Sequence, residues 1–207
     1  LTNLGSIELN RGNQKQALSL QLKATQCAPE LSATWGNLAN CYLQIGNMKE
    51  AEISCLKSIK LNPNLFNSHF LLATILKSQK RLHEAKISLK RAIKLNPNYF
   101  QIHLSLGSVL KDLGDLKSAE KSTRKAIELN PNYANSYSNL GGILKDLGEL
   151  KSAETSTRKS IQLDSNFAEA HLNLGGILKE LNNLKEAELS TRNAINLNPN
   201  YDIAYLN

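Results

Sequence analysis

The spacing of proline is the feature that most limits how this sequence can fold. The five prolines stand at positions 29, 63, 97, 131 and 199, so every interval is 34 residues or twice that length. A fixed period of about 20 to 50 residues is the signature of a repeat architecture, in which each unit packs mainly against its neighbours. The 207 residues therefore predict one continuous array, and not one or two globular domains that each have a single core.

A repeat frame follows when each unit begins three residues after its proline. The frame gives a partial repeat, 1–31, then five complete repeats, 32–65, 66–99, 100–133, 134–167 and 168–201, and the start of another, 202–207. Places within a repeat are counted from the first residue of each complete range. The chain does not begin with Met, and its only Met is Met48, so we expect a segment of a longer protein, with a processed or engineered protein as the alternative.

Apolar and small residues recur in the same places of every repeat. Place seven is always Leu, place eight is always Gly or Ala, and place twenty is always Ala. In the repeat that starts at Phe100, Leu106, Leu110 and Leu113 follow helical spacing, and a second helical stripe begins at Leu116. Small residues at fixed places allow two helices to approach to about 8–10 Å. Each repeat is therefore predicted to be a pair of closely packed helices.

Turn residues separate and end these helices. Between the two stripes stand Gly12, Gly46, Gly114, Gly148 and Asn182, residues that favour the left-handed stop of a helix. The second helix ends in Leu-Asn-Pro-Asn, because proline lacks the amide donor and clashes with the preceding turn. Two departures are visible. The 134–167 repeat has Asp-Ser-Asn in place of Asn-Pro-Asn, where we expect the same turn, and the 66–99 repeat has no Gly between its helices.

The pattern resembles the tetratricopeptide repeat, a helix-turn-helix unit of 34 residues. The 32–65 repeat carries the matching residues Trp35, Leu38, Ala39, Tyr42, Ala51, Ser58 and Pro63. The resemblance implies an all-α, right-handed superhelical solenoid of antiparallel helix pairs. It also implies that the first helices line a concave groove through places two, five, six, nine, twelve and thirteen. At place eleven, where the family often has Tyr, this sequence has Glu8, so we expect the first unit to lie at an exposed edge.

Composition agrees with a soluble, helical protein, which we expect to be cytoplasmic. Hydrophobic residues make up 41% and charged residues 21%, which is too apolar for a disordered protein. No stretch reaches the roughly 18 consecutive apolar residues of a membrane span, and no signal peptide is apparent. Cys27, Cys41 and Cys55 form no Cys-x-x-Cys pair and occupy helical, apolar positions. They indicate buried free thiols in a reducing compartment, with a disulfide or a metal site as the alternative.

Catalysis, cofactors and metals find little support in a sequence whose residues recur in up to six copies. His69, His103 and His171 all occupy place four, one or more repeats apart, whereas zinc ligands converge within about 2 Å of one ion. We interpret them as packing residues. Gly141-Gly142 and Gly175-Gly176 lie inside predicted helices with no preceding strand, so they are not phosphate loops. We expect no enzyme, no cofactor and no metal.

The resemblance makes place six a candidate peptide-binding column. This place holds Asn3, Asn37, Leu71, Ser105, Asn139, Asn173 and Asn207, and Asn40 stands at the inner place nine. An amide side chain has donors and an acceptor, so it can bracket a peptide backbone of any sequence. The asparagine ladder in the repeat region of O-linked N-acetylglucosamine transferases is similar. The alternative is that Asn merely suits a solvated helical face.

Place twelve adds a second candidate column, with Lys77, Lys111, Lys145 and Lys179. If it faces the groove, it forms a basic stripe that attracts acidic partners. The neighbouring Asp112, Asp146 and Glu180 offer the alternative of solvated charge pairs. The sites where chaperone-binding repeats carry cations hold Gly36, Phe70 and Leu71, which argues against that activity.

Charge and one divergent repeat bear on this interpretation. The net charge of +7 makes nucleic acid a weaker alternative partner, but Arg124, Arg158 and Arg192 alternate with glutamates, as on a solubilising surface. The 66–99 repeat departs most, and we form the hypothesis that Phe70, Leu71 and the Lys80-Arg81 pair make a specificity patch. The alternative is a repeat that has drifted locally.

The sequence thus predicts a non-catalytic scaffold that binds protein or extended peptide in its concave groove, without a membrane span. The alternatives are the substrate-recruiting arm of a larger transferase and, less favoured, a nucleic-acid-binding repeat. Leu1 and Leu4 at one end, and Ile203, Tyr205 and Leu206 at the other, also predict end-to-end association between copies of the protein.

Overall fold

The structure is a computed structural model that describes residues 2–199, and this range contains twelve helices and no strand. The helices are α1 (Thr2–Asn10), α2 (Gln14–Cys27), α3 (Ser32–Ile45), α4 (Met48–Leu61), α5 (Phe66–Ser78), α6 (Leu82–Leu95), α7 (Phe100–Asp112), α8 (Leu116–Leu129), α9 (Ala134–Asp146), α10 (Leu150–Leu163), α11 (Ala168–Glu180) and α12 (Leu184–Leu197). The protein forms two compact units, Leu1–Asn98 and Tyr99–Asn207, here called unit 1 and unit 2. A single array over residues 1–207 stays a prediction.

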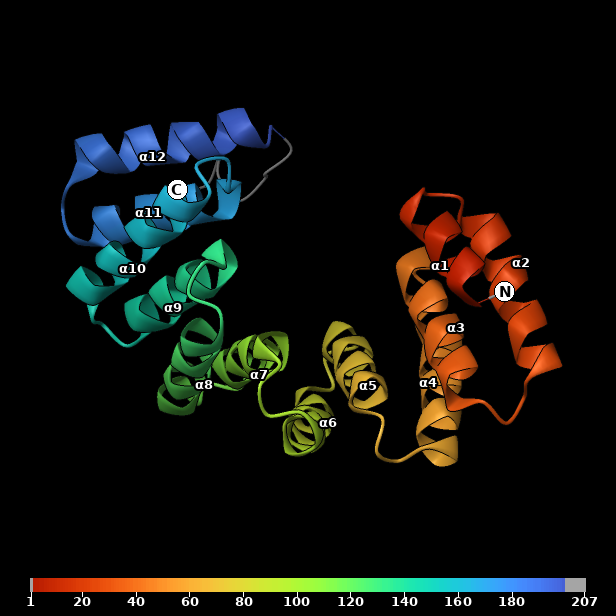
Figure 1. The fold of residues 1–207 in the computed structure, drawn as a ribbon. Coiled ribbons are helices and arrows are strands. Elements are labelled where there is room, and N and C mark those ends of the chain that lie inside the picture. The colour runs from red at the N-terminus through yellow and green to blue at the C-terminus, as the bar shows by residue number, and fades with distance from the viewer. Residues whose placement is uncertain (1, 200–207) are drawn as a thin grey trace. The chain divides into compact units, whose positions relative to one another are not determined.

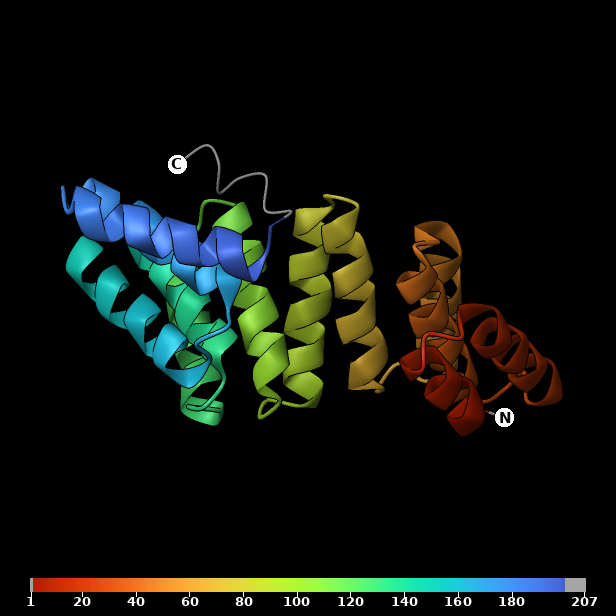
Figure 2. The same cartoon turned by 90° about the horizontal axis from the view of Figure 1, so that it is seen from above.

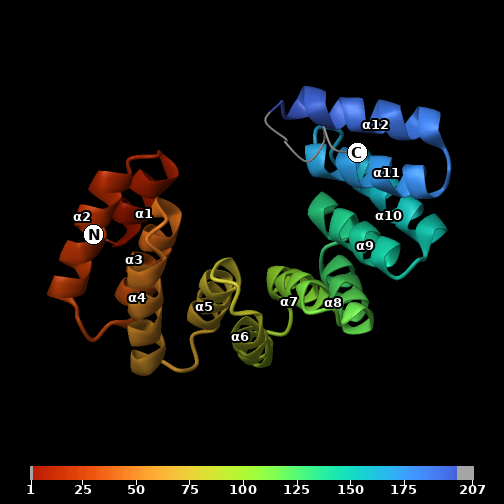
Figure 3. The ribbon, with the colours of Figure 1, turned by 180° about the vertical axis from the view of Figure 1, so that it is seen from behind.

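Each unit consists of three antiparallel helix pairs (Figure 1). In unit 1 the pairs are α1–α2, α3–α4 and α5–α6, and in unit 2 they are α7–α8, α9–α10 and α11–α12. Each second helix also contacts the first helix of the next pair in its unit, and successive first helices contact each other. Figures 2 and 3 present the pairs from above and from behind. The predicted all-α tetratricopeptide architecture is confirmed.

The core lies within and between the helix pairs. In unit 2, Leu140 and Leu144 of α9 pack with Ala153 of α10 and with Ile177 of α11, so one cluster joins two successive repeats. The alanine at place twenty is fully buried in most pairs, as at Ala153. Such contacts make each repeat depend on its neighbour for stability.

The eighth place is the point of closest approach between the helices of a pair. A Cβ on Gly141 would collide with the hydroxyl oxygen of Thr157, and it would lie 3.2 Å from the carbonyl oxygen of Ala153. The same collision would occur between Gly107 and Thr123. Glycine is therefore required in these pairs because the opposing threonine fills the space of a methyl group.

The turn within each pair uses one backbone geometry, including the repeat that lacks glycine. Gly46 has φ of 86°, and Lys80 reaches φ of 62° at the equivalent place. Both turns are closed by the same two backbone hydrogen bonds. In the first, Gly46 N–H donates to Leu43 O at 3.0 Å and Lys80 N–H donates to Lys77 O at 2.9 Å. In the second, the N–H of the following residue donates to the carbonyl oxygen of place eleven. The packing of the pair therefore dictates the left-handed turn, and Lys80 adopts it against its own preference.

The linker between repeats is closed by local hydrogen bonds. The side chain of Asn62 accepts from the amide of Asn64 at 3.0 Å, which spans the proline that has no amide of its own. Asp164 makes the same bond to Asn166 at 3.0 Å, so the turn expected in the repeat without proline is confirmed. Place four then holds the linker from the other side, since His69 Nε2 lies 2.9 Å from the carbonyl oxygen of Pro63.

One expectation about an individual residue is wrong, and Glu8 has a structural role. Cys27 is exposed because, as the last residue of α2, it lies on the solvent side of a turn whose Ala24 and Thr25 are buried, whereas Cys41 and Cys55 are buried free thiols. Glu8 is 5% exposed, because its carboxylate accepts hydrogen bonds from Asn13 Nδ2 at 2.6 Å and from Arg11 at 3.1 Å. It closes the α1–α2 turn, and the position of the first unit at an exposed edge stays a prediction.

Within residues 2–199, no helix combines the length and the apolar character that a membrane crossing requires. The predicted end-to-end contact falls largely on Leu1, Ile203, Tyr205 and Leu206, which lie outside the described residues, as does Asn207. Leu4 is 48% exposed on α1. Self-association stays a prediction.

Replacing Lys80 with glycine should stabilise the protein. A non-glycine residue in the left-handed region costs about 1 kcal/mol, so K80G is expected to raise the free energy of unfolding by about that amount. Urea denaturation followed by circular dichroism measures the change. N182G is the matched control, with a smaller gain because Asn tolerates φ of 60°. A loss of stability in K80G would contradict the assignment of strain to this turn.

Adjacent glycines of α9 should respond in opposite ways to alanine. G141A is expected to cost about 1–3 kcal/mol because its Cβ meets Thr157, and T157A should relieve most of that cost in the double variant. G142A should be neutral or stabilising by up to about 1 kcal/mol, since its Cβ meets only the flexible end of Lys111, at 3.0 Å. Urea midpoints compare the four proteins. Equal losses for the two single variants would contradict the close approach at place eight.

Only one of the three thiols should react in the folded protein. Burial raises the pKa of the Cys55 thiol to about 12 and also raises that of Cys41, so both stay protonated and shielded at about pH 8. Mass spectrometry after iodoacetamide treatment should find a single adduct, on Cys27, and three after denaturation. Rapid modification of Cys55 in the folded state would show that its site opens.

Candidate functional site

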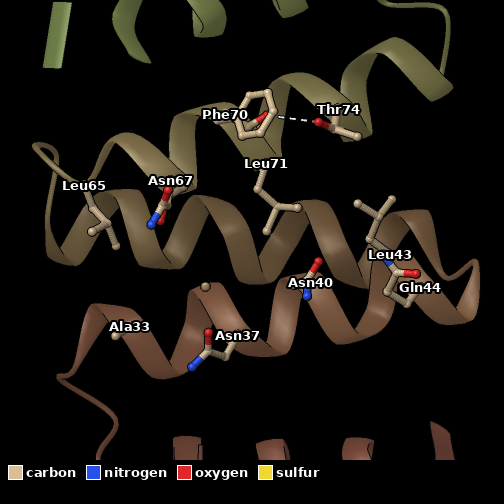
Figure 4. Close-up of a pocket in the computed structure, with 12 residues that line it drawn as sticks. Ala33, Asn37, Asn40, Leu43, Gln44, Leu65, Asn67, Phe70, Leu71 and Thr74 are labelled. Atoms are coloured by element: carbon tan, nitrogen blue, oxygen red, sulfur yellow. Dashed lines mark hydrogen bonds between the residues drawn. The ribbon is translucent and has the colours of Figure 1, made fainter. Parts of the chain in front are cut away.

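A pocket of about 580 Å³ lies between α3 and α5 in unit 1. It is lined by Ala33, Gly36, Asn37, Asn40, Leu43 and Gln44 of α3, and by Leu65, Asn67, Ser68, Phe70, Leu71 and Thr74 at and after the start of α5. The α3 residues occupy places two, five, six, nine, twelve and thirteen, the set that the tetratricopeptide resemblance places in the groove. The packing of successive first helices therefore brings those places to one surface (Figure 4).

Amide side chains border the pocket on both helices. Asn37 and Asn40 lie one helical turn apart on α3, and Asn67 and Phe70 project from α5 across from them (Figure 4). Within the described part of the protein, none of these three asparagine side chains hydrogen-bonds another residue. The Thr74 hydroxyl is engaged by its own helix, at 3.2 Å from the carbonyl oxygen of Phe70. The amides are therefore available to a ligand.

The apolar part of the pocket comes from Leu43 on α3 and from Phe70 and Leu71 on α5, all half-buried. None of the twelve lining residues carries a charge. The surface can accommodate an apolar side chain and hydrogen-bond a neutral backbone, but it offers no cation for a carboxylate. Two lining amides, Asn67 and Gln44, were not singled out from the sequence, although places two and thirteen were among the expected inner places.

The other predicted asparagines do not join this pocket. Asn3 is exposed on α1. In unit 2, Asn173 of α11 donates from Nδ2 to the Ser138 hydroxyl of α9 at 2.9 Å, so its amide partly serves to join two repeats. Asn139 is half-buried on α9.

The lysine column forms joints between repeats in unit 2. Lys111 Nζ lies 3.4 Å from Asp146 and 3.0 Å from the position of a Cβ on Gly142 in the next repeat. Lys145 repeats the arrangement, with Glu180 at 3.2 Å. Each lysine thus lies over a glycine and pairs with an acid that follows 35 residues later. The charge-pairing alternative holds for these two lysines.

The remaining two lysines occupy different settings, since Lys77 is half-buried on α5 and Lys179 is exposed on α11. The hypothetical patch of the 66–99 repeat is divided. Phe70 and Leu71 line the pocket, but Arg81 pairs with Glu52 at 2.7 Å. The basic half of that patch therefore fastens the turn before α6 to α4.

Residues 2–199 contain no cluster of three or more His, Cys, Asp or Glu side chains that could hold a metal ion. The histidines at place four have a structural partner. His171 Nε2 lies 3.0 Å from the carbonyl oxygen of Ser165, as His69 does beside Pro63, and Trp35 Nε1 donates to Pro29 O at 2.8 Å. Place four therefore fastens the linker to the following helix.

Comparison with solved structures supports the fold. PilF of Pseudomonas aeruginosa is 22% identical, with a TM-score of 0.85 over 99% of this chain and 93% of that chain. Cut9, in the APC/C Cut9–Hcn1 hetero-tetramer, is 16% identical, with a TM-score of 0.89 over 99% of this chain and 41% of that one. YrrB, described as a TPR protein with an unusual peptide-binding site, is 22% identical, with a TM-score of 0.69 over 90% of this chain and 96% of that chain.

A comparison with curated protein sequences finds no significant match. The family model for the Cilia and flagella-associated protein 70 C-terminal domain matches residues 1–200. This match spans both units and every helix pair of the structure. The chain therefore belongs to the family of tetratricopeptide-repeat proteins defined by the C-terminal domain of cilia and flagella-associated protein 70.

Proposed function

We propose that the protein is a non-catalytic scaffold that binds an extended polypeptide in the pocket between α3 and α5. The observation that carries the proposal is the arrangement of three unengaged amide side chains around an uncharged, apolar surface. Asn3, Asn139, Asn173 and the lysine column stay predictions as further contacts.

The amides suit a peptide backbone because each one offers donors and an acceptor that match the carbonyl and amide groups of the backbone. Asn37 and Asn40 lie on one side of the pocket and Asn67 on the other, so both edges of an extended segment have a partner. Backbone recognition of this kind is independent of the ligand sequence, which is what a scaffold requires.

The apolar residues supply selectivity. Leu43, Phe70 and Leu71 line the part of the pocket in which a large aliphatic or aromatic side chain would lose its contact with water. The burial of one such side chain is worth about 1.5–3 kcal/mol. The preferred ligand is therefore a neutral segment with one large apolar residue.

The comparisons support an interaction role in general terms. YrrB is described as having a peptide-binding site, and Cut9 is found in a complex with Hcn1. Neither likeness identifies the partner of this protein, because each is below 25% identity and concerns the fold.

Substitution of the pocket residues should weaken peptide binding. Random 12-residue peptides displayed on phage would be selected on the 207-residue protein, and the affinity of a selected peptide would be measured by fluorescence anisotropy. N37A/N40A and F70S/L71N should each reduce affinity by about tenfold or more. Because no lining residue is charged, affinity should change little between about 50 and 500 mM salt.

Q14A/Q16A is the matched control, since it removes two exposed amides from α2, a helix that does not line the pocket, and should leave affinity within about twofold. Selected peptides that bind N37A/N40A as tightly as the unmodified protein would refute the site. Peptides that carry acidic clusters and lose binding as salt rises would point to lysines outside the pocket instead.

A further inference from the structure

Net charge differs between the two units. Residues 1–98 carry thirteen Lys and Arg against five Asp and Glu, a net charge of +8, and residues 99–207 carry twelve against thirteen, a net charge of −1. The positive charge of the whole protein therefore belongs to unit 1.

Among the described helices, the arginines on the second helices of unit 2 are paired, whereas several lysines on the second helices of unit 1 are not. On the second helices of unit 2, Arg124, Arg158 and Arg192 each pair with the glutamate four residues earlier, at 2.7–3.0 Å. On α4 and α6, Lys49, Lys60, Lys90 and Lys94 are exposed, and within the described part of the protein none of them has an ion-pair or hydrogen-bond partner. Unit 1 therefore presents uncompensated cations.

Aliphatic side chains lie among these lysines. Ile53 and Leu56 of α4 are 52% and 49% exposed, and Ile87 of α6 is 68% exposed. Lys49, Ile53, Leu56 and Lys60 follow i, i+4, i+7 and i+11 spacing, so they share one helical face. Ile87, Lys90 and Lys94 occupy the same places on α6 as Ile53, Leu56 and Lys60 on α4.

Side-chain contacts link the two helices. Arg81, at the start of α6, contacts Glu52 in the first half of α4 at 2.7 Å, and Arg91 contacts Asn64, just after α4, at 3.2 Å. Glu84 also pairs with Arg81, at 2.6 Å. Glu52 and Glu84 therefore both pair with Arg81, so neither carboxylate neutralises a lysine of this face.

We propose that this outer face, formed by Ile53, Leu56 and Ile87 with the lysines of α4 and α6, binds an acidic amphipathic helix of a partner protein. The apolar stripe of such a helix would cover the aliphatic side chains, and its carboxylates would meet the lysines. A nucleic-acid backbone would pair with the lysines but give the aliphatic side chains nothing to pack against. The face also has no Trp or Phe of the kind that anchors proteins in a bilayer surface.

The probe for this site is a designed helical peptide of about 20 residues with a leucine stripe flanked by glutamates. Its fluorescence anisotropy would be followed on titration with the 207-residue protein. We expect I53S/L56S and K60E/K94E each to weaken binding by about tenfold or more, and rising salt to weaken it as well. A peptide of the same composition in scrambled order should bind much more weakly.

Three control variants separate this face from the rest of the molecule. L189S removes an exposed aliphatic side chain of unit 2, and K121E reverses the charge of an exposed lysine of unit 2. Both residues stand at place twenty-two, which Ile53 and Ile87 occupy in unit 1. F70S/L71N alters the α3–α5 pocket. All three should bind the acidic peptide as the unmodified protein does, so the result is independent of the proposed pocket function.

Two outcomes would overturn the proposal. One is unchanged affinity of the acidic peptide for I53S/L56S, which would show that the aliphatic side chains make no contact. The other is binding of phosphatidylserine vesicles or a random single-stranded oligonucleotide, lost in K60E/K94E, while the acidic peptide fails to bind. That result would assign the face to lipid or nucleic acid.

Discussion

The close approach of two helices at place eight is the constraint on which the remaining structure depends. Where threonine opposes glycine, as at Thr157 and Gly141, no larger residue fits between the helices. This spacing fixes how each pair presents its first helix and therefore which places reach the surface between successive first helices. The pocket between α3 and α5, whose helices have Ala39 and Ala73 at place eight, follows the same repeat frame, because its lining occupies the inner places of the repeat and not a specialised loop. In such a protein the repeat frame determines where a ligand site lies, and the side chains at a few inner places determine its chemistry.

Much of the fold could be predicted from the sequence because the determinants are local. The period, the place-twenty alanine and the Asn-Pro-Asn linker specify helix pairs, and the first helices begin where the frame begins each repeat, from Ser32 to Ala168. The turn at Asp164 was also predictable, since an aspartate can replace asparagine as acceptor. Single positions governed by tertiary packing were not. Lys80 is forced into a left-handed turn by its neighbours, a state that its own propensity disfavours.

The sequence predicted which places of the repeat line the candidate site, but not which of the predicted residues belong to it. Asn37 and Asn40 line the pocket because α3 and α5 pack side by side. Asn173, in contrast, donates a hydrogen bond from its side chain to the Ser138 hydroxyl. Lys111 and Lys145 belonged to a regular column, yet the acids they contact lie 35 residues onward and not beside them in sequence. The period reveals which residues are equivalent. It does not reveal which of the equivalent side chains already bind a neighbouring residue and so are unavailable to a ligand.

The joint made by Lys111, Gly142 and Asp146 bears on how such an array evolves. A repeat that carries the lysine at place twelve, the glycine at place nine and an acid at place thirteen holds both halves of the connection. A tandem copy of that repeat therefore fits its parent at once, without compensating substitutions. Gene duplication can lengthen this part of the protein one unit at a time, and the near identity of residues 111–127 and 145–161 is what recent copying would leave behind.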